Sequence, residues 1–178
     1  MKFIARVELL LIGLWLGAAL FFSLGVAPSA FSVLQNTELA GNVVNRTLTV
    51  VNFSGLAIGV LLLIASFLPR EYPGAVWAWL RRILLFAVAA GCGAGQFIIG
   101  IWISYVRLQI GKPVGELAAD DPLKLRFDQL HQASVWTLVI AMSAAFLVFF
   151  VMTKKGASAA KQQPAADPVL DFPTDLKI

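Results

Sequence analysis

Four long stretches of the chain contain no Asp, Glu, Lys or Arg, and they constrain its fold more than any other feature. These stretches are residues 9–37, 47–69, 83–106 and 129–153. A hydrocarbon core about 30 Å thick takes roughly 20 helical residues to cross, so each stretch is long enough. Lipid offers no partner to unpaired backbone groups, and these stretches are too long and too continuously apolar for barrel strands. The sequence therefore predicts an all-α integral membrane bundle of four transmembrane helices.

The composition excludes a water-soluble globular protein. Of the 178 residues, 59% are apolar and only 13% are charged, whereas soluble domains have about a quarter charged residues. We expect a transmembrane domain over residues 1–152 with helices at about 8–28, 37–68, 80–107 and 122–152, followed by a disordered cytoplasmic tail, 153–178. The first stretch could also be a cleaved signal peptide, but it is longer than the usual apolar region of one. We keep it as a helix that Pro28 ends or kinks.

The distribution of Lys and Arg predicts the orientation of the bundle. Nine of these residues flank the termini and the connection between the second and third helices, and five lie near the other two connections. Cytoplasmic loops carry the excess of basic residues in membrane proteins. Both termini are therefore expected in the cytoplasm, and the first and third connections on the outer side.

Polar residues gather on one face of each of three predicted helices, toward the outer side. The second helix contributes Glu38, Asn42, Asn45, Thr49 and Asn52, the third Gln96, Gly100 and Arg107, and the fourth Lys124, Asp128 and His131. Their spacing of three, four or seven residues places each set on one helical face. Polar residues within a membrane usually face the bundle interior or a water-filled cavity. We expect either a ligand pocket, with His131, Asp128, Gln96, Asn45, Asn52 and Arg107 as candidate residues, or interhelical hydrogen bonds with no ligand.

The supply of metal-binding and catalytic side chains is small. The chain has one His and one Cys, and its carboxylates lie at the predicted membrane surfaces. Because a metal site needs three or four ligands, we expect neither a metal site nor catalytic residues within one copy. A haem or other porphyrin is possible through His131 if a partner supplies a second ligand. Asp128, one turn earlier, would then orient the His131 ring.

Glycines separated by four residues occur in three of the predicted helices, at Gly13 and Gly17, Gly55 and Gly59, and Gly91 and Gly95. Small residues at this spacing let membrane helices approach closely. They predict packing within the bundle, or contact with a second copy or another membrane protein. Besides the lipid bilayer we expect no nucleic-acid partner, because the net charge of +4 is small and lies mostly on the cytoplasmic flanks.

Several fragments resemble a known membrane family. They are Leu14-Trp15-Leu16-Gly17, Phe21-Phe22 and Ala27-Pro28 in the first helix, and Arg126-Phe127-Asp128-Gln129-Leu130-His131 with Ser134 in the fourth. These fragments resemble the domain of unknown function 4149 membrane family, the family of transmembrane protein 205-like proteins, over residues 9 to about 152. The chain is also distantly similar to copper-resistance D-like membrane domains and to a haem-linked protoporphyrinogen oxidase. The resemblance implies a four-helix membrane protein without an assigned reaction.

These features leave three hypotheses for function. Packing residues are plentiful and reactive constellations are absent, which favours a non-enzymatic accessory subunit or small scaffold of a larger membrane assembly. The converging polar faces favour instead a haem-binding or small-ligand-binding protein with an outer-leaflet pocket around His131. The third hypothesis is a transporter of a small solute, without proton coupling because no ionisable residue is predicted at mid-membrane.

Overall fold

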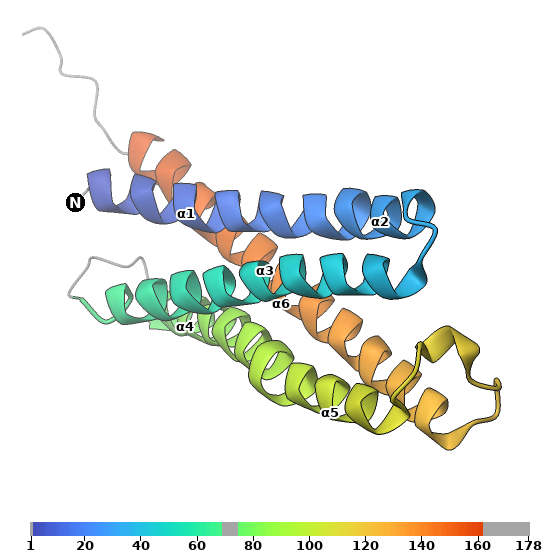
Figure 1. Ribbon diagram of the computed structural model, residues 1–178. Coiled ribbons are helices and arrows are strands. Elements are labelled where there is room, and N and C mark those ends of the chain that lie inside the picture. Colours follow the sequence, from blue (N-terminus) through green and yellow to red (C-terminus); the bar gives the residue numbers. More distant parts are fainter. Residues whose placement is uncertain (1, 69–74, 162–178) are drawn as a thin grey trace, which may run out of the picture.

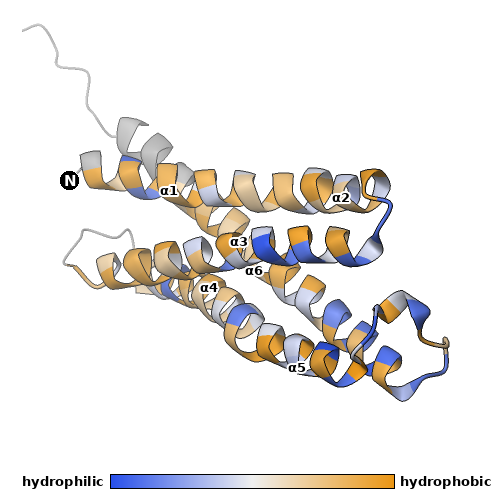
Figure 2. Cartoon of the chain, viewed as in Figure 1, coloured by the Kyte–Doolittle hydropathy of each residue, from blue (hydrophilic) through white to orange (hydrophobic). Residues whose placement is uncertain are grey.

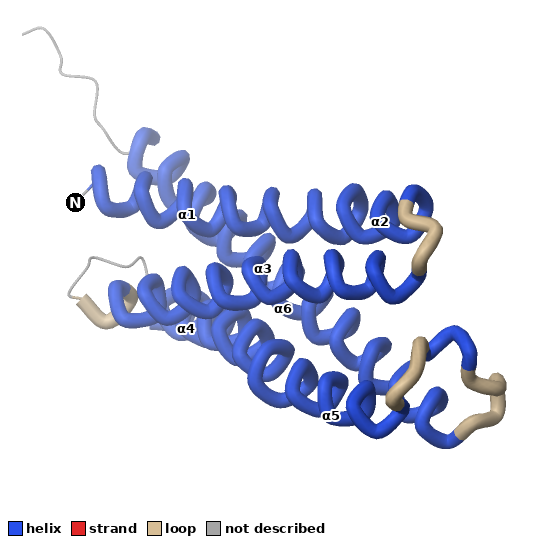
Figure 3. The backbone as a smooth tube through the Cα atoms, viewed as in Figure 1, coloured by secondary structure: helices blue, strands red, loops and turns tan. Residues whose placement is uncertain are grey.

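The computed structural model describes residues 2–68 and 75–161, which contain no β-strand (Figure 3). The α-helices are α1 (Lys2–Phe21), α2 (Ala27–Val33), α3 (Thr37–Ala65), α4 (Ala75–Gly93), α5 (Gly100–Ile110) and α6 (Pro122–Lys161). A π-helical turn, Phe22–Val26, joins α1 to α2, and a second one, Ala94–Ile99, joins α4 to α5. With these turns, the described residues form four long helical rods (Figure 1).

All four rods are long and apolar enough to cross a membrane. The candidate spans are Ile4–Val33, Thr37–Ala65, Ala75–Ile110 and Pro122–Met152. Large apolar side chains point outward from them, as Leu14 and Phe21 do on the first rod. Figure 2 shows apolar residues along the rods and polar residues concentrated near the α3–α5–α6 end. The predicted fold class, an all-α bundle with four transmembrane helices, is confirmed, and the chain is a multi-pass membrane protein.

The first rod continues past the residue expected to end or kink it. The prediction was 8–28, whereas helix extends from Lys2 to Val33 and passes through Pro28. Proline lacks the N–H that would bond to the preceding turn and crowds the carbonyl there. The π-helical turn directly before Ala27 widens the helix at this point, which is a known way to accommodate such a break.

Other helix boundaries also differ from the predicted ones. The rod predicted at 80–107 begins at Ala75 and ends at Ile110, where Gly111 adopts a left-handed conformation with φ 63°. Helix α3 ends at Ala65 rather than 68. Helix α6 extends from Pro122 to Lys161, beyond the predicted end at 152, so the first nine residues of the predicted disordered tail are helical. Residues 162–178 of that tail lie outside the described residues.

Close packing in the centre of the bundle depends on a notch in α3. The Trp15 indole N–H donates a hydrogen bond of 2.9 Å to the Val51 carbonyl oxygen on α3. A Cβ atom at Gly55 would lie 2.5 Å from the Trp15 Nε1 atom and 2.5 Å from the Cys92 Sγ atom of α4. The missing side chain of Gly55 thus lets α1 and α4 approach α3 together. Around this point the core is continuous with Ile12, Leu85 and Val148.

The two ends of the bundle are built differently. We call the end with Ile4, residues 66–68, Ala75 and Met152 the terminal end, and the end with residues 34–36 and 111–121 the long-loop end. At the terminal end, Arg81 Nη2 and Glu8 Oε2 form an ion pair of 2.9 Å, with side chains only 5% and 3% exposed. In the sequence both residues lie beside charge-free stretches, and nothing in the local pattern of α1 or α4 shows that they face each other.

At the long-loop end the rods separate. Helix α3 packs on α1 and α4, α5 packs on α6, and Figure 1 shows α3 and α5 diverging toward this end. Two helices begin here with side-chain caps. Asn36 Oδ1 accepts hydrogen bonds from the Glu38 and Leu39 N–H groups at 2.8 and 3.2 Å, and Asp121 Oδ1 accepts one from the Leu123 N–H group at 2.8 Å. Side-chain caps of this kind satisfy the free N–H groups of a first helical turn.

Candidate functional site

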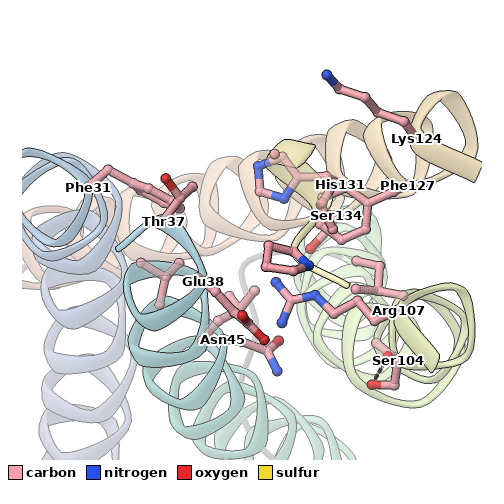
Figure 4. Close-up of a pocket in the computed structure, with 18 of the residues that line it drawn as sticks. Phe31, Thr37, Glu38, Asn45, Ser104, Arg107, Lys124, Phe127, His131 and Ser134 are labelled. Carbon is pink, nitrogen blue, oxygen red and sulfur yellow. Dashed lines mark hydrogen bonds between the residues drawn. The ribbon is translucent and has the colours of Figure 1, made fainter. Parts of the chain in front are cut away.

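A cavity of about 1210 Å³ occupies the space between the separated rods at the long-loop end (Figure 4). Helix α3 forms one wall, α5 and the π-helical turn before it form the second, and the start of α6 forms the third. The 111–116 connection lies at its mouth. The polar faces predicted on three helices therefore do meet in one place. Of the candidate residues, the cavity is lined by Asn45, Asn52, Gln96, Arg107 and His131.

Among the cavity-lining residues of α3, Asn52 lies farthest from the long-loop end, and it is only 4% exposed. Its carboxamide lies against the backbone of the facing rod, since a Cβ atom at Gly95 would be 3.3 Å from Asn52 Nδ2. Gln96 follows Gly95 and also lines the cavity. We call Asn52, Gly95 and Gln96 the amide floor. Within residues 4–68 and 75–152, the Asn52 side chain has no hydrogen-bond partner.

Higher in the cavity, the Arg107 guanidinium reaches from α5 across to α3. Its Nη1 atom donates a hydrogen bond of 3.1 Å to Asn42 Oδ1. Gly41 leaves room for it, because a Cβ atom there would lie 3.1 Å from Arg107 Nη2. The Arg107 Cζ atom is 5.4 Å from the centre of the Phe127 ring on α6. Contacts from α3 and α6 therefore hold the guanidinium in the gap between the rods.

On α6, the His131 ring lies parallel to the Phe127 ring, with the centres 6.3 Å apart. The predicted partner of His131 is placed elsewhere. Asp128 is exposed and is not among the cavity-lining residues. Within the described part of the chain, no hydrogen bond joins its carboxylate to His131. Ser134, one turn below His131, is 9% exposed and lines the cavity.

The charged groups around the cavity include both signs. Three cationic side chains line it, Arg107, Lys112 and Lys124, and two carboxylates, Glu38 and Glu116. The Lys124 Nζ atom is 3.5 Å from the Leu117 carbonyl oxygen, which fixes α6 to the connection. Because the cationic groups are in the majority, the cavity favours an anionic or neutral occupant over a cation.

Sequence reasoning missed two kinds of cavity residue. Lys112–Glu116 and Gln35 lie in connections, where helical periodicity carries no information about facing. Gly41 falls three residues after Glu38 and four before Asn45, so it is in step with the predicted polar face. Its spacing could have identified it, but a glycine among polar residues gives no sign that another side chain will cross it.

The candidate ligands of a metal ion do not gather in the described part of the chain. In residues 4–68 and 75–152, no three His, Cys, Asp or Glu side chains lie close enough to hold a metal ion. Cys92 is buried in the core between α4 and α3, away from the cavity lining. His131 is thus the one cavity-lining side chain of the described residues that suits an axial haem ligand.

A family model described as Domain of unknown function (DUF4149) matches residues 10–112, more than half of the chain. No curated protein and no solved structure matches the chain significantly. The match includes α3, α5, the amide floor and Arg107. It ends before α6, so the fragment around His131 that carried much of the resemblance lies outside it, and the distant similarities to copper-resistance and haem-linked proteins remain predictions. By the matched segment, the chain belongs to the DUF4149 family, a family of unknown function.

Proposed function

We propose that this chain is a non-enzymatic membrane protein that binds a small ligand in the cavity at the long-loop end. The distribution of basic residues predicts that this end lies on the outer side of the membrane. One observation carries the proposal. The structure describes five buried polar or charged residues, Glu8, Asn52, Ser66, Arg81 and Ser134.

Three of these five residues have a partner in the fold. Glu8 pairs with Arg81, and the Ser66 hydroxyl donates to the Leu63 carbonyl oxygen over 2.6 Å. Asn52 and Ser134 have no side-chain hydrogen bond to a described residue, and both line the cavity. The polar atoms of these two side chains are not fully enclosed by protein, so an occupant of the cavity can hydrogen-bond to them. Ligand sites carry a few such polar groups, placed where a bound molecule satisfies them.

The shape and lining of the cavity support the same function. Ligand sites are concave, mostly apolar and supplied with a few placed polar groups. Phe31, Leu48 and Ile101 are among the apolar residues that line the cavity. The volume of about 1210 Å³ leaves ample room for a small ligand, since common small-molecule sites measure roughly 300–1,000 Å³.

The substitution Asn52→Leu tests the proposal. We expect the wild-type protein, purified from its native membrane in mild detergent, to retain a small molecule that mass spectrometry detects after denaturation. Asn52→Leu should lower its occupancy about tenfold, because the ligand loses hydrogen bonds to a buried amide. In protein stripped of the ligand, the melting temperature of Asn52→Leu should stay equal or rise, since Leu replaces a polar group without a partner by an apolar one of similar volume.

Thr47→Val is the matched control on α3. The Thr47 hydroxyl donates to the Val43 carbonyl oxygen of its own helix, and Thr47 does not line the cavity. This variant should retain the ligand as the wild type does. A less stable Asn52→Leu protein, together with a wild type that retains nothing, would show that Asn52 has a structural role and would contradict the proposal.

The accessory-subunit hypothesis has less structural support. It depended on glycine faces, but Cβ atoms at Gly13, Gly55, Gly59, Gly91 and Gly95 would all lie within 3.3 Å of other atoms of this chain. Those faces are used inside the bundle. At Gly17 a Cβ atom would have no neighbour within 4 Å. Of these glycines, only Gly17 is free to contact another protein and so supports an accessory role, whereas the cavity supports ligand binding.

A further inference from the structure

We infer that Arg107 binds an oxyanion of the ligand, a phosphate or carboxylate group carried either by a lipid or by a soluble molecule. The inference rests on the proposed function, because it assigns the chemistry of a ligand in the same cavity. It begins with the hydrogen-bond donors of Arg107. A guanidinium has five N–H donors in a planar fork that matches the oxygens of carboxylate and phosphate.

The fold engages only part of that fork. Arg107 Nη1 donates to Asn42, and the Nη2 atom has no hydrogen bond to a described residue, whereas the Nε atom is buried out of reach. No carboxylate of the described residues forms an ion pair with Arg107 at 4.0 Å or less. Asn42 is uncharged, so it orients the guanidinium without neutralising it. A positive charge with free donors therefore faces a cavity within the membrane domain.

The surroundings of Arg107 keep it in this position. Gly41 provides the space on α3 that the Nη2 atom occupies, and the Phe127 ring lies below the guanidinium plane on the α6 side. The charge on the guanidinium is attracted to the face of an aromatic ring. Figure 4 shows Arg107 between the Glu38–Asn45 side of α3 and the Phe127–Ser134 side of α6. The fork is held in place before a ligand arrives, and preorganisation of this kind strengthens binding.

The other cations add to the same field. Lys112 and Lys124 line the mouth, and the two lining carboxylates, Glu38 and Glu116, are both exposed. The cavity extends along α3 from Glu38 to Asn52, about 21 Å at 1.5 Å per residue. A lipid headgroup can enter at the level of Arg107 from the membrane, and a soluble anion can enter from the loops. The experiment has one arm for each source.

The test uses the full chain in nanodiscs. In the first arm, phosphatidylcholine nanodiscs are dialysed against radiolabelled inorganic phosphate to measure binding of a soluble anion. In the second, the nanodiscs contain a minority of phosphatidylglycerol, and lipids retained on transfer to detergent are identified by native mass spectrometry. We expect at least one arm to show binding by the wild type. Arg107→Gln should weaken that binding about 30-fold, which is typical of losing a charge-assisted, bidentate contact.

Arg126→Gln is the matched control. Arg126 is at the same end of the bundle with its Cζ atom 5.4 Å from the Trp102 ring, but it does not line the cavity. Removing this charge should leave binding within about twofold, because an exposed charge outside the site is screened by solvent and salt. Arg107→Lys keeps the charge without the fork and should give an intermediate affinity. Gly41→Val keeps Arg107 itself but fills the space of its Nη2 atom, and it should also weaken binding.

The outcomes separate this inference from the proposed function. If the wild type retains a neutral molecule that is lost in Asn52→Leu and kept in Arg107→Gln, the anion inference is wrong and the ligand-binding function stands. If neither probe binds and no molecule is retained, both are wrong. If Arg107→Gln does not fold, Gly41→Val and Arg107→Lys decide, and binding equal to that of the wild type in both overturns the inference.

Discussion

Replacement of Arg81 by Leu is expected to lower the free energy of unfolding by about 3–5 kcal/mol, the largest effect of any single substitution considered for this chain. Arg81 and Glu8 are 5% and 3% exposed and pair at 2.9 Å between α4 and α1. Replacing Arg81 removes the guanidinium that pairs with the buried Glu8 carboxylate. Measurement of unfolding in a fixed detergent, with helicity as the signal, gives the change directly.

The double variant Glu8→Leu with Arg81→Leu distinguishes loss of a charge partner from loss of packing. It removes both charges, so most of the lost stability should return, because a buried ion pair contributes little more than apolar residues of similar volume. Arg6→Leu is the control, because Arg6 is an exposed residue on α1, the helix that carries Glu8. Its loss should change the free energy of unfolding by less than about 0.5 kcal/mol. A double variant as unstable as Arg81→Leu alone would contradict this explanation.

Addition of one methyl group at Gly55 is expected to be nearly as disruptive. The new Cβ atom would lie 2.5 Å from Trp15 Nε1 and 2.5 Å from Cys92 Sγ, and it would also collide with the indole ring that bonds to Val51. Overpacking in a dense core costs about 1–3 kcal/mol, and contact with two helices at once places Gly55→Ala at the upper end of that range. The same unfolding measurement in detergent tests it.

Gly17→Ala is the matched control for Gly55→Ala. Both glycines are interior positions of transmembrane helices, but a Cβ atom at Gly17 would have no neighbour within 4 Å. Gly17→Ala should therefore be neutral or slightly stabilising, because alanine favours helix over glycine. Combining Gly55→Ala with Cys92→Ala removes the Sγ contact and should recover part of the loss. Equal effects of the two glycine substitutions would show that the notch in α3 does not determine the packing.

Much of the candidate site was predictable, because helical periodicity predicts which residues share a face of a helix. Asn45, Asn52 and Gln96 were assigned to the cavity from spacing alone, and all of them line it. Periodicity failed for Asp128, which shares the spacing of His131 but is exposed outside the cavity. A spacing rule tolerates tens of degrees of rotation about the helix axis, and only the packing of α6 on its neighbours selects the angle.

Arg81 and Glu8 also show what local sequence patterns cannot predict. Sequence reasoning treated each as a charge at a membrane boundary, where basic residues are expected. Arg81 on α4 meets Glu8 on α1, although the two residues are 73 positions apart in sequence. Their contact follows from the relative height and rotation of the two rods. No local pattern contains that information, since it depends on how the whole core packs.

The sequence by itself determined that the chain crosses a membrane four times as helices, because long charge-free stretches and the lack of hydrogen-bond partners in lipid allow no other fold. It also determined which residues could face one another, through the periodicity of the helix. Only the tertiary structure decided that the glycines close the centre of the bundle, that α3 and α5 separate beyond it, and that Asn52 remains without a partner in the space between them. Those outcomes depend on contacts between distant segments, and such contacts exist only once all four rods have packed.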